Sequence, residues 1–306
     1  MEAERKVGTP YVVTVMLTHN HYEDTRECLD SLLQVDYPDQ QILVVDNASQ
    51  DETPKRISTE FPQVNLIQND QNLGVPAGYN VGILHALKGG ADYIFMVNND
   101  IVLSTDILTR LVAAAEADSA AGIVMPKMFY YGEENKVWSN GGWYRRFPPA
   151  IMLTHHDDAF DDRSRLIEFA PACGLLIHRR AFESAGLFDP GYFFNYEDWD
   201  FSKRVRAQGL HIWYAPQTHL WHKVSRSTLD SGSSFYWRTH GASTARYYRR
   251  HGKPAWLSLP VHAGYIILRD FIWKRRQRYF RDFWQGMLEG MKKPLGAYPR
   301  YQYSDS

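Results

Sequence analysis

Three carboxylates crowd into one short stretch of this 306-residue chain, between aromatic side chains. Glu197, Asp198 and Asp200 lie in the segment 195–200 (NYEDWD), where the pattern also predicts the start of a helix. A carboxylate held beside a reacting hydroxyl can take its proton as a general base. Acidic residues in a first helical turn also complement the helix dipole, so the cluster taken alone leaves both interpretations open.

Polar side chains also follow four apolar runs in the first half of the chain. The runs are 11–17, 41–45, 64–67 and 93–97, and each has the pattern of a buried strand. The segments that follow them are 18–20 (THN), 46–49 (DNAS), 69–72 (NDQN) and 98–100 (NND). Strand-to-helix loops are often polar because their residues cap the next helix, but four together favour a binding site.

The elements between these loops have helical spacing, so strands and helices alternate. Helices are predicted at 24–33, 51–61, 76–87 and 105–117, and later at 180–185 and 197–207. Further strands are predicted at 173–178 and 211–214, whereas 125–168 is irregular. Alternation of this kind predicts a doubly wound parallel sheet, in which ligands bind outside the carboxyl ends of the strands.

The composition is that of a globular protein, with 44% hydrophobic and 23% charged residues. Two cysteines, Cys28 and Cys173, lie far apart and outside any CxxC spacing, so neither a zinc site nor a disulfide framework is expected. Residues 1–10 lack the apolar core of a signal peptide, and the most apolar window, 255–268, is too short to span a bilayer. We therefore expect a cytoplasmic chain.

The quoted motifs occur in an order that resembles family 2 of the inverting glycosyltransferases, specifically its rhamnosyltransferase-like bacterial branch. The resemblance covers 12–228 and rests on 18–20, 46–53 (DNASQDET), 72–80 (NLGVPAGYN), 98–100, 186–189 (GLFD), 197–198 and His222. It implies an α/β GT-A fold: a Rossmann-like, mostly parallel sheet with helices on both faces, here followed by a C-terminal helical extension. It also implies a nucleotide-diphosphate sugar as donor, with dTDP- or UDP-sugars expected.

The resemblance assigns ten residues to nucleotide-sugar binding: Thr18, Asn20, Asp46, Asn47, Asn72, Gly74, Gly78, Asn80, Asn98 and Asn99. Asp46 can accept a hydrogen bond from a pyrimidine imide N–H. The small residues Gly74 and Gly78 let backbone approach a sugar diphosphate, and Asn80 can hold that loop by side-chain hydrogen bonds. A glycine at a helix N-cap is the simpler alternative for this stretch.

Asn98-Asn99-Asp100 stands where the family usually has Asp-x-Asp, the motif that binds Mg²⁺ or Mn²⁺ on the diphosphate. One carboxylate is missing, so Asp100 is the expected metal ligand and Asn98 a water-mediated or sugar contact. His222 comes 24 residues after Asp198, where some family members place a histidine ligand. An imidazole ligand favours Mn²⁺ somewhat over Mg²⁺.

The implied mechanism is a single in-line displacement that inverts the anomeric carbon. Asp198 is expected to act as the general base on the acceptor hydroxyl, while Glu197 orients the acceptor or holds the base ionised. The sequence does not divide the work between these two carboxylates.

The C-terminal part of the chain is basic and aromatic. Residues 240–306 hold 13 Lys and Arg against 4 Asp and Glu, within a net charge of −1 for the whole chain. Apolar residues within 266–288 keep a helical stripe opposite cations, which predicts an interfacial amphipathic helix. The stripe could instead pack on the catalytic part or on a second copy, which leaves a homodimer open.

An anionic membrane is the expected partner of residues 246–293, at the inner face of the cell membrane. Nucleic acid is the competing partner of a basic-aromatic segment, but no nucleic-acid module accompanies it, so none is expected. The expected acceptor is a glycan or a polyprenyl-diphosphate-linked glycan of the cell surface.

The expected domains are a GT-A catalytic domain at 1–234 and a basic helical extension at 235–306. Within the first, the nucleotide-binding half is about 10–120 and the acceptor half about 121–234. Two other functions stay open: a nucleotide-sugar-binding protein with reduced catalysis, which the weakened 98–100 motif allows, and a nucleotidyltransferase of similar fold.

Overall fold

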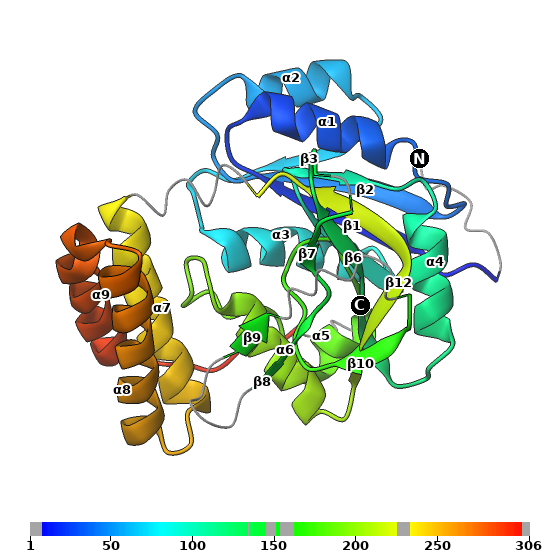
Figure 1. Ribbon diagram of the computed structural model, residues 1–306. Helices are drawn as coiled ribbons and strands as arrows, with labels where there is room; N and C mark the ends of the chain where they lie inside the picture. Colours follow the sequence, from blue (N-terminus) through cyan, green and yellow to red (C-terminus); the bar gives the residue numbers. More distant parts are fainter. Residues whose placement is uncertain (1–7, 134, 145–150, 154–161, 225–232, 302–306) are drawn as a thin grey trace.

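A mixed sheet of ten strands forms the centre of the computed structural model, which describes residues 8–133, 135–144, 151–153, 162–224 and 233–301 (Figure 1). Its strands are β1 (Val12–Thr18), β2 (Gln40–Asp46), β3 (Asn65–Gln68), β4 (Tyr93–Asn98), β5 (Ile101–Leu103), β6 (Ala121–Tyr130), β7 (Val137–Ser139), β10 (Arg165–Ile167), β11 (Leu175–His178) and β12 (His211–His222). A separate hairpin joins β8 (Gly142–Tyr144) to β9 (Ile151–Leu153).

Helices surround this sheet, and three more follow it in the chain. They are α1 (Tyr22–Leu32), α2 (Thr53–Glu60), α3 (Val75–Lys88), α4 (Ile107–Glu116), α5 (Arg179–Ala185), α6 (Glu197–Ala207), α7 (Ser234–His251), α8 (Ala255–Ile266) and α9 (Phe280–Lys292). A π-helix (Ile267–Trp273) continues α8, and a 3-10 turn (Gln277–Tyr279) precedes α9. No helix in the described ranges combines the length and apolar character needed to cross a bilayer.

The strand order is β10-β12-β6-β11-β4-β1-β2-β3. The four strands β3, β2, β1 and β4 are parallel to one another, and β12 is parallel to β6. Only β11, between β4 and β6, runs against the strands on both of its sides in this path. The predicted mostly parallel sheet is therefore confirmed, with one antiparallel strand in its centre.

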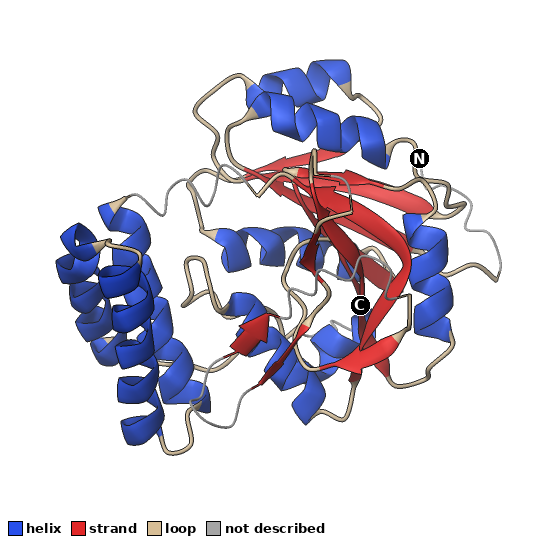
Figure 2. Ribbon diagram, in the orientation of Figure 1, coloured by secondary structure: helices blue, strands red, loops and turns tan. Residues whose placement is uncertain are grey.

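Helices cover both faces of the sheet, as predicted (Figure 2). Side chains alternate along β1, and Thr18 hydrogen-bonds through Oγ1 to Thr25 of α1, at 2.8 Å. Val15 points the other way and lies beneath Gly82 of α3, whose missing Cβ would be 2.4 Å from it. The two helices thus pack on opposite faces of the same strand.

The prediction that 125–168 is irregular was wrong at its start, because β6 extends to Tyr130. Pro126 interrupts the strand pattern in the sequence. In the fold, the register of β12 skips from Ala215 to His219 beside Pro126 and Lys127, so the proline lies at an irregularity in the ladder. The strand predicted at 211–214 was too short for the same reason: β12 continues through the irregularity to His222.

The predicted continuous helix over 266–288 was also wrong. The chain reverses after Trp273, and the bundle of α7, α8 and α9 lies at one side of the sheet (Figure 1). The reversal lets Phe271 and Phe283 both contact Trp237, with ring centroids 4.8 and 6.4 Å apart. Burial of this second apolar core outweighs the continuity of one helix.

This second core is separate from the core of the sheet, but it takes Tyr192 and Tyr196 from the segment before residue 234. The division of the chain at 234 stays a prediction. The extension and the loop before α6 share one apolar interior.

Candidate active site

Three polar loops meet at the carboxyl edge of the parallel strands. In the register of the sheet, Thr18 is opposite Asp46, and Leu17 is opposite Asn98. The loops after β1, β2 and β4 therefore start at the same edge, as the strand pattern predicts. This is the edge at which open α/β sheets bind ligands.

The loops after β1 and β2 form one hydrogen-bonded unit around Asp46. The buried Asp46 carboxylate accepts from the Ser49 hydroxyl and amide at 2.5 and 3.1 Å. The Ser49 hydroxyl in turn accepts from the Asn20 amide N–H at 2.7 Å, and Asn20 Oδ1 accepts from the Gln50 N–H at 2.8 Å. Asn20 and Ala48 have left-handed backbone, with φ of 58° and 64°, a strain that clusters at functional sites.

Asn47 holds the loop that leads into α3. Its Nδ2 donates to Asn72 Oδ1 at 3.0 Å and to the Gly74 carbonyl at 3.1 Å, while its Oδ1 accepts from the Asn69 side chain and the Leu73 N–H, each at 3.1 Å. Both ends of the Asn47 amide are thus engaged within the protein. The structure gives Asn47 and Asn72 a positioning role for this loop.

The two glycines at the start of α3 make room for protein. A Cβ on Gly74 would lie 2.5 Å from the Phe193 carbonyl, which accepts from the Val75 N–H at 2.7 Å. A Cβ on Gly78 would lie 2.7 Å from Leu17. We expected these glycines to make room for a sugar diphosphate. At the two Cβ positions the space is instead taken by protein atoms, those of Phe193 and Leu17.

Asn80 holds a different loop from the predicted one. Its Nδ2 donates to the Phe188 carbonyl at 2.8 Å, and its Oδ1 accepts from the Phe188 N–H at 3.0 Å. The expectation that Asn80 fixes the loop before α3 is therefore corrected. Asn80 instead ties α3 to the segment 186–189, which leads toward α6.

Asn98 and Asn99 are both engaged by neighbouring side chains. Asn98 Oδ1 accepts from the Tyr79 hydroxyl at 2.7 Å. Asn99 Nδ2 donates to Thr18 and Thr25 Oγ1 at 3.3 and 3.1 Å. In the segment 98–100 the carboxylate of Asp100 is left as the oxygen donor suited to a hard cation.

Asp100 and His222 lie together although they are 122 positions apart in the chain. The antiparallel pairing of β5 with β12 places His222 opposite Ile101, and His222 Nε2 lies 3.3 Å from Asp100 Oδ1. That Asp100 oxygen and both ring nitrogens of His222 are buried without a hydrogen-bond partner among the described residues. Trp138 packs edge-on against the imidazole, with ring centroids 4.3 Å apart.

These orphaned atoms fit a divalent cation, because a carboxylate oxygen and an imidazole nitrogen are both metal donors. The described residues contain no group of three or more His, Cys, Asp or Glu that could hold a metal by themselves. A cation here would take its other ligands from the substrate or from water.

Glu197 and Asp198 begin α6, after a left-handed Tyr196 with φ of 73°. Asp198 Oδ2 accepts from the Ala172 N–H at 3.3 Å and Oδ1 from the Trp199 N–H at 2.8 Å. Burial raises the pKa of both carboxyls, and the charge of Asp198 raises that of Glu197 further. Glu197 Oε2 has no hydrogen-bond partner among the described residues.

Asp200 has a structural position, unlike its two neighbours. Its carboxylate contacts Arg204 at 2.8 Å, His251 Nε2 at 2.6 Å and the Tyr298 hydroxyl at 3.0 Å. Burial acts to raise the pKa of Asp200, but the hydrogen bond from His251 and the charge of Arg204 lower it on balance. Asp200 fastens α6 to the C-terminal extension.

Tyr79 is buried beside the segment 98–100, and its hydroxyl donates to Asn98 Oδ1 at 2.7 Å. Burial raises the pKa of Tyr79. The sequence analysis missed Tyr79, although it lies within the 72–80 motif, and it missed Trp138, which no motif marks.

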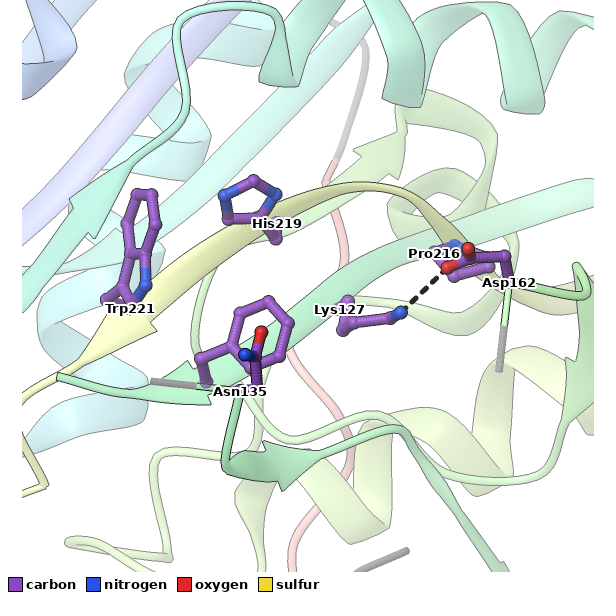
Figure 3. Close-up of a pocket in the computed structure, with 7 residues that line it drawn as sticks. Lys127, Asn135, Asp162, Pro216, His219 and Trp221 are labelled. Atoms are coloured by element: carbon purple, nitrogen blue, oxygen red, sulfur yellow. Dashed lines mark hydrogen bonds and ion pairs between the residues drawn. The ribbon is translucent and has the colours of Figure 1, made fainter. Parts of the chain in front are cut away.

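A pocket of about 520 Å³ lies elsewhere, over β6 and β12 (Figure 3). Its lining includes His219, Trp221 and Lys127, whose Nζ forms a 2.8 Å ion pair with Asp162. Because side chains alternate along β12, His219 and Trp221 point to the face opposite His222. This pocket is therefore not the place where the predicted site residues gather.

The family model described as Glycosyl transferase family 2 matches residues 14–185. The N-acetylglucosaminyl-diphospho-decaprenol L-rhamnosyltransferase of Mycobacterium tuberculosis is 23% identical over 257 residues, 76% of this chain and 83% of that protein. The dTDP-rhamnosyl transferase RfbF of Shigella flexneri is 23% identical over 276 residues, 84% of this chain and 88% of that protein.

Two solved structures share the fold. A mannosyltransferase from Pyrobaculum calidifontis, in complex with GDP-Man and Mn²⁺, matches with a TM-score of 0.57 and 16% identity, over 93% of this chain and 86% of that chain. GalNAc-T7 with UDP, GalNAc and Mn²⁺ matches with a TM-score of 0.60 and 15% identity, over 78% of this chain and 48% of that chain.

Proposed function

Because this chain belongs to glycosyl transferase family 2 and is a glycosyltransferase, we propose that it moves a sugar from a nucleotide-diphosphate sugar to a hydroxyl of a lipid-linked glycan, with inversion at the anomeric carbon. One observation carries the proposal. Asp100 Oδ1 and both ring nitrogens of His222 are buried without a hydrogen-bond partner among the described residues, and Asp100 lies two residues after Asn98, at the sheet edge where Asp46 also lies.

Asp198 is the proposed general base. Its raised pKa brings the carboxyl nearer to the working pH, where a base is most effective. The hydrogen bonds from the Ala172 and Trp199 N–H groups fix its two oxygens. In the reaction the acceptor oxygen bonds to the anomeric carbon, the bond from that carbon to the diphosphate oxygen breaks, and the acceptor proton goes to Asp198.

Glu197 is proposed to stay protonated and to orient the acceptor. Its pKa is raised by burial and by the charge of Asp198, so a proton on Glu197 lets Asp198 remain ionised. A protonated carboxyl can donate a hydrogen bond to a sugar oxygen. This divides the roles that the sequence left undivided.

Asp100 and His222 are the proposed ligands of Mn²⁺ or Mg²⁺. Such an ion, when bound, would neutralise the negative charge that develops on the departing nucleoside diphosphate. The Asp46 carboxylate, which accepts a hydrogen bond from Ser49, would contact the nucleobase of the donor. The loop that contains Asn20 would lie against the nucleoside.

The names of two rhamnosyltransferases that this chain resembles support a proposal for the donor and the acceptor. Their names specify a dTDP-rhamnosyl donor in one case and a diphospho-decaprenol acceptor in another. We propose a deoxysugar or hexose on dTDP or UDP as donor and a polyprenyl-diphosphate-linked glycan as acceptor. Such an acceptor would place the enzyme at the cytoplasmic face of the cell membrane.

The test combines donor binding with turnover. Thermal unfolding is measured with UDP, dTDP, GDP and CMP and their common sugars, each with Mn²⁺, Mg²⁺ or a chelator. A ligand at one hundred times its Kd adds about 2.7 kcal/mol of stability, which raises Tm by several degrees. The donor found is then incubated with a polyprenyl-diphosphate-linked sugar, and the product is analysed by mass spectrometry and NMR.

A glycoside of inverted configuration, absent with Asp198→Asn, is the expected product. A product that retains a nucleoside phosphate would mean a nucleotidyltransferase. Metal-dependent donor binding without turnover would mean the binding protein of reduced activity that Asn98 allows. Folded protein that responds to none of the nucleotides would overturn the proposal.

A further inference from the structure

The helical extension exposes large apolar side chains to an unusual extent. Trp273 and Trp256 are 86% and 77% exposed, the highest values among the exposed large hydrophobic residues. The others on the same segment are Leu257, Tyr265, Leu268, Ile272, Phe280, Trp284, Leu288 and Met291. Contiguous exposed apolar surface of this kind marks an interaction site.

These residues form two stripes on the outside of the bundle. Leu268 and Ile272 follow each other by one helical turn on the continuation of α8, and Phe280, Trp284 and Leu288 repeat at the same spacing on α9. The predicted apolar stripe within 266–288 divides between two environments. Phe280, Trp284 and Leu288 are exposed, whereas Phe271, Phe283 and Met287 pack in the second core. We call the surface formed by these exposed residues the outer face: Trp256, Leu257, Tyr265, Leu268, Ile272, Trp273, Phe280, Trp284, Leu288 and Met291.

Cations gather at the turn where the two stripes meet. Lys274, Arg275, Arg278 and Arg281 are exposed and directly follow Trp273. No carboxylate pairs with Arg275, Arg278 or Arg281 among the described residues, whereas Lys274 lies 3.6 Å from the buried Asp270, which Arg269 also contacts. The turn thus presents unneutralised positive charge next to the most exposed tryptophan.

We propose that the outer face docks on an anionic phospholipid bilayer, with Trp273 and Ile272 at the level of the headgroups and the arginines on the lipid phosphates. Tryptophan prefers the interface between water and hydrocarbon, and cations near an anionic leaflet bind its surface charge. A second copy of the chain fits less well, because a two-fold contact would bring the cation cluster against itself.

The same helices that carry the outer face also hold the catalytic loop. On the inner side of α8, His262 Nε2 lies 3.0 Å from the Tyr196 hydroxyl, which also accepts from Thr244 of α7 at 3.0 Å. Tyr196 directly precedes Glu197. Docking would therefore fix the position of Glu197 and Asp198 relative to the bilayer. The importance of this position for catalysis rests on the proposed function, whereas the docking surface itself does not depend on it.

The test is flotation of the full chain with vesicles of phosphatidylcholine, with and without phosphatidylglycerol. We expect binding only to the anionic vesicles. The triple variant Arg275→Glu, Arg278→Glu, Arg281→Glu should bind on the order of a hundredfold more weakly, since each cation near an anionic surface contributes to the attraction. The matched control, Lys55→Glu, Lys88→Glu, Arg110→Glu, changes the net charge equally on exposed residues of the sheet domain and should bind like the parent chain.

A second measurement follows insertion directly. Brominated lipids should quench tryptophan emission of the parent chain, and Trp273→Phe should lose much of that quenching. Equal binding to neutral and anionic vesicles, equal loss with the control variant, or a dimer in light scattering that the triple variant dissolves would overturn the docking proposal.

Two further measurements, donor binding and sugar transfer to a water-soluble acceptor, distinguish the docking proposal from the proposed function. Donor binding and transfer should both be unchanged in the triple variant. Intact transfer without vesicle binding would overturn the docking surface alone, and intact docking without transfer would overturn the proposed function alone.

Discussion

His222 Nε2 lies 3.3 Å from Asp100 Oδ1, and both atoms are buried without a hydrogen-bond partner among the described residues. Two polar groups left in this state are costly unless a ligand satisfies them. We therefore expect His222→Ala and Asp100→Asn to weaken Mn²⁺ binding in the presence of nucleoside diphosphate by at least about tenfold, since each removes one proposed ligand. Calorimetric titration of Mn²⁺ measures the change.

His219→Ala is the matched control for His222→Ala. His219 lies on the same strand, three residues earlier, but points to the opposite face with Trp221. It should leave Mn²⁺ affinity unchanged. Equal loss in both variants would mean that the strand, rather than the ligand, had been damaged.

The two carboxyls at the start of α6 should respond differently to substitution. Asp198→Asn removes the proposed base, so kcat should fall by about a hundredfold to ten-thousandfold while donor affinity persists. Glu197→Gln retains the shape of a protonated Glu197, and we expect a loss of less than about tenfold, because only a hydrogen-bond donor is altered. Steady-state kinetics with the identified donor decide this, and a reversed order of the two losses would exchange their roles.

kcat/KM should fall as the pH is lowered, and this fall should be centred at a higher pH than the ordinary pKa of an aspartate. Burial raises the pKa of Asp198, so its ionised fraction falls at a higher pH than that of an exposed carboxylate, whose pKa is about 3.9. The fall should persist in Glu197→Gln, because Glu197 is already protonated there. A fall that disappears in this variant would show that Glu197, and not Asp198, is the group that titrates.

The sequence predicted the sheet edge and its loops well because local patterns carry that information. Apolar runs followed by Asp46 and by the segment 98–100 place these residues at one edge whenever the strands are parallel. The role of Asn80 was beyond local patterns, since its partner Phe188 lies 108 positions away in the chain. The partners of Tyr196 in the extension, His262 and Thr244, are equally remote.

The extension shows a second reason for failure. A stripe of apolar residues has the same appearance in a sequence whether it faces lipid or another helix. Phe271 and Phe283 pack with Trp237, whereas their chain neighbours Ile272 and Trp284 are exposed, and the chain reversal after Trp273 brings the two buried rings to the same core. Hydrophobic periodicity does not encode such a reversal.

The ion pair between Arg246 and Asp189 should contribute more to stability than any exposed pair. Arg246 donates to both Asp189 oxygens at 2.9 and 2.8 Å, and the two side chains are 9% and 2% exposed. Arg246→Ala removes two charge-assisted hydrogen bonds but leaves Arg250 Nε 2.9 Å from the buried Asp189 carboxylate, so it should lower the free energy of unfolding by about 1.5–3 kcal/mol. Arg238→Ala is the control, because its pair with Glu289 is 55% and 40% exposed and contributes about 1 kcal/mol or less. Urea unfolding compares them, and equal effects would contradict the assignment.

Two glycines of the bundle should respond to alanine with opposite signs. Gly286 lies where α9 meets α7, and a Cβ there would be 1.8 Å from the Arg238 carbonyl oxygen, which is backbone and cannot rotate away. Gly286→Ala must therefore push the helices apart, at a cost of about 1–3 kcal/mol in the free energy of unfolding.

Gly264, in α8, has no heavy atom within 4 Å of the position of its Cβ. Gly264→Ala should stabilise the chain by up to about 1 kcal/mol, because alanine has the higher helix propensity. Both variants remove one glycine from a helix, so the difference in their urea midpoints isolates packing from propensity. Equal stability of the two variants would contradict the close packing of α7 against α9. It would also weaken the inference that α7 holds Tyr196 in place through Thr244.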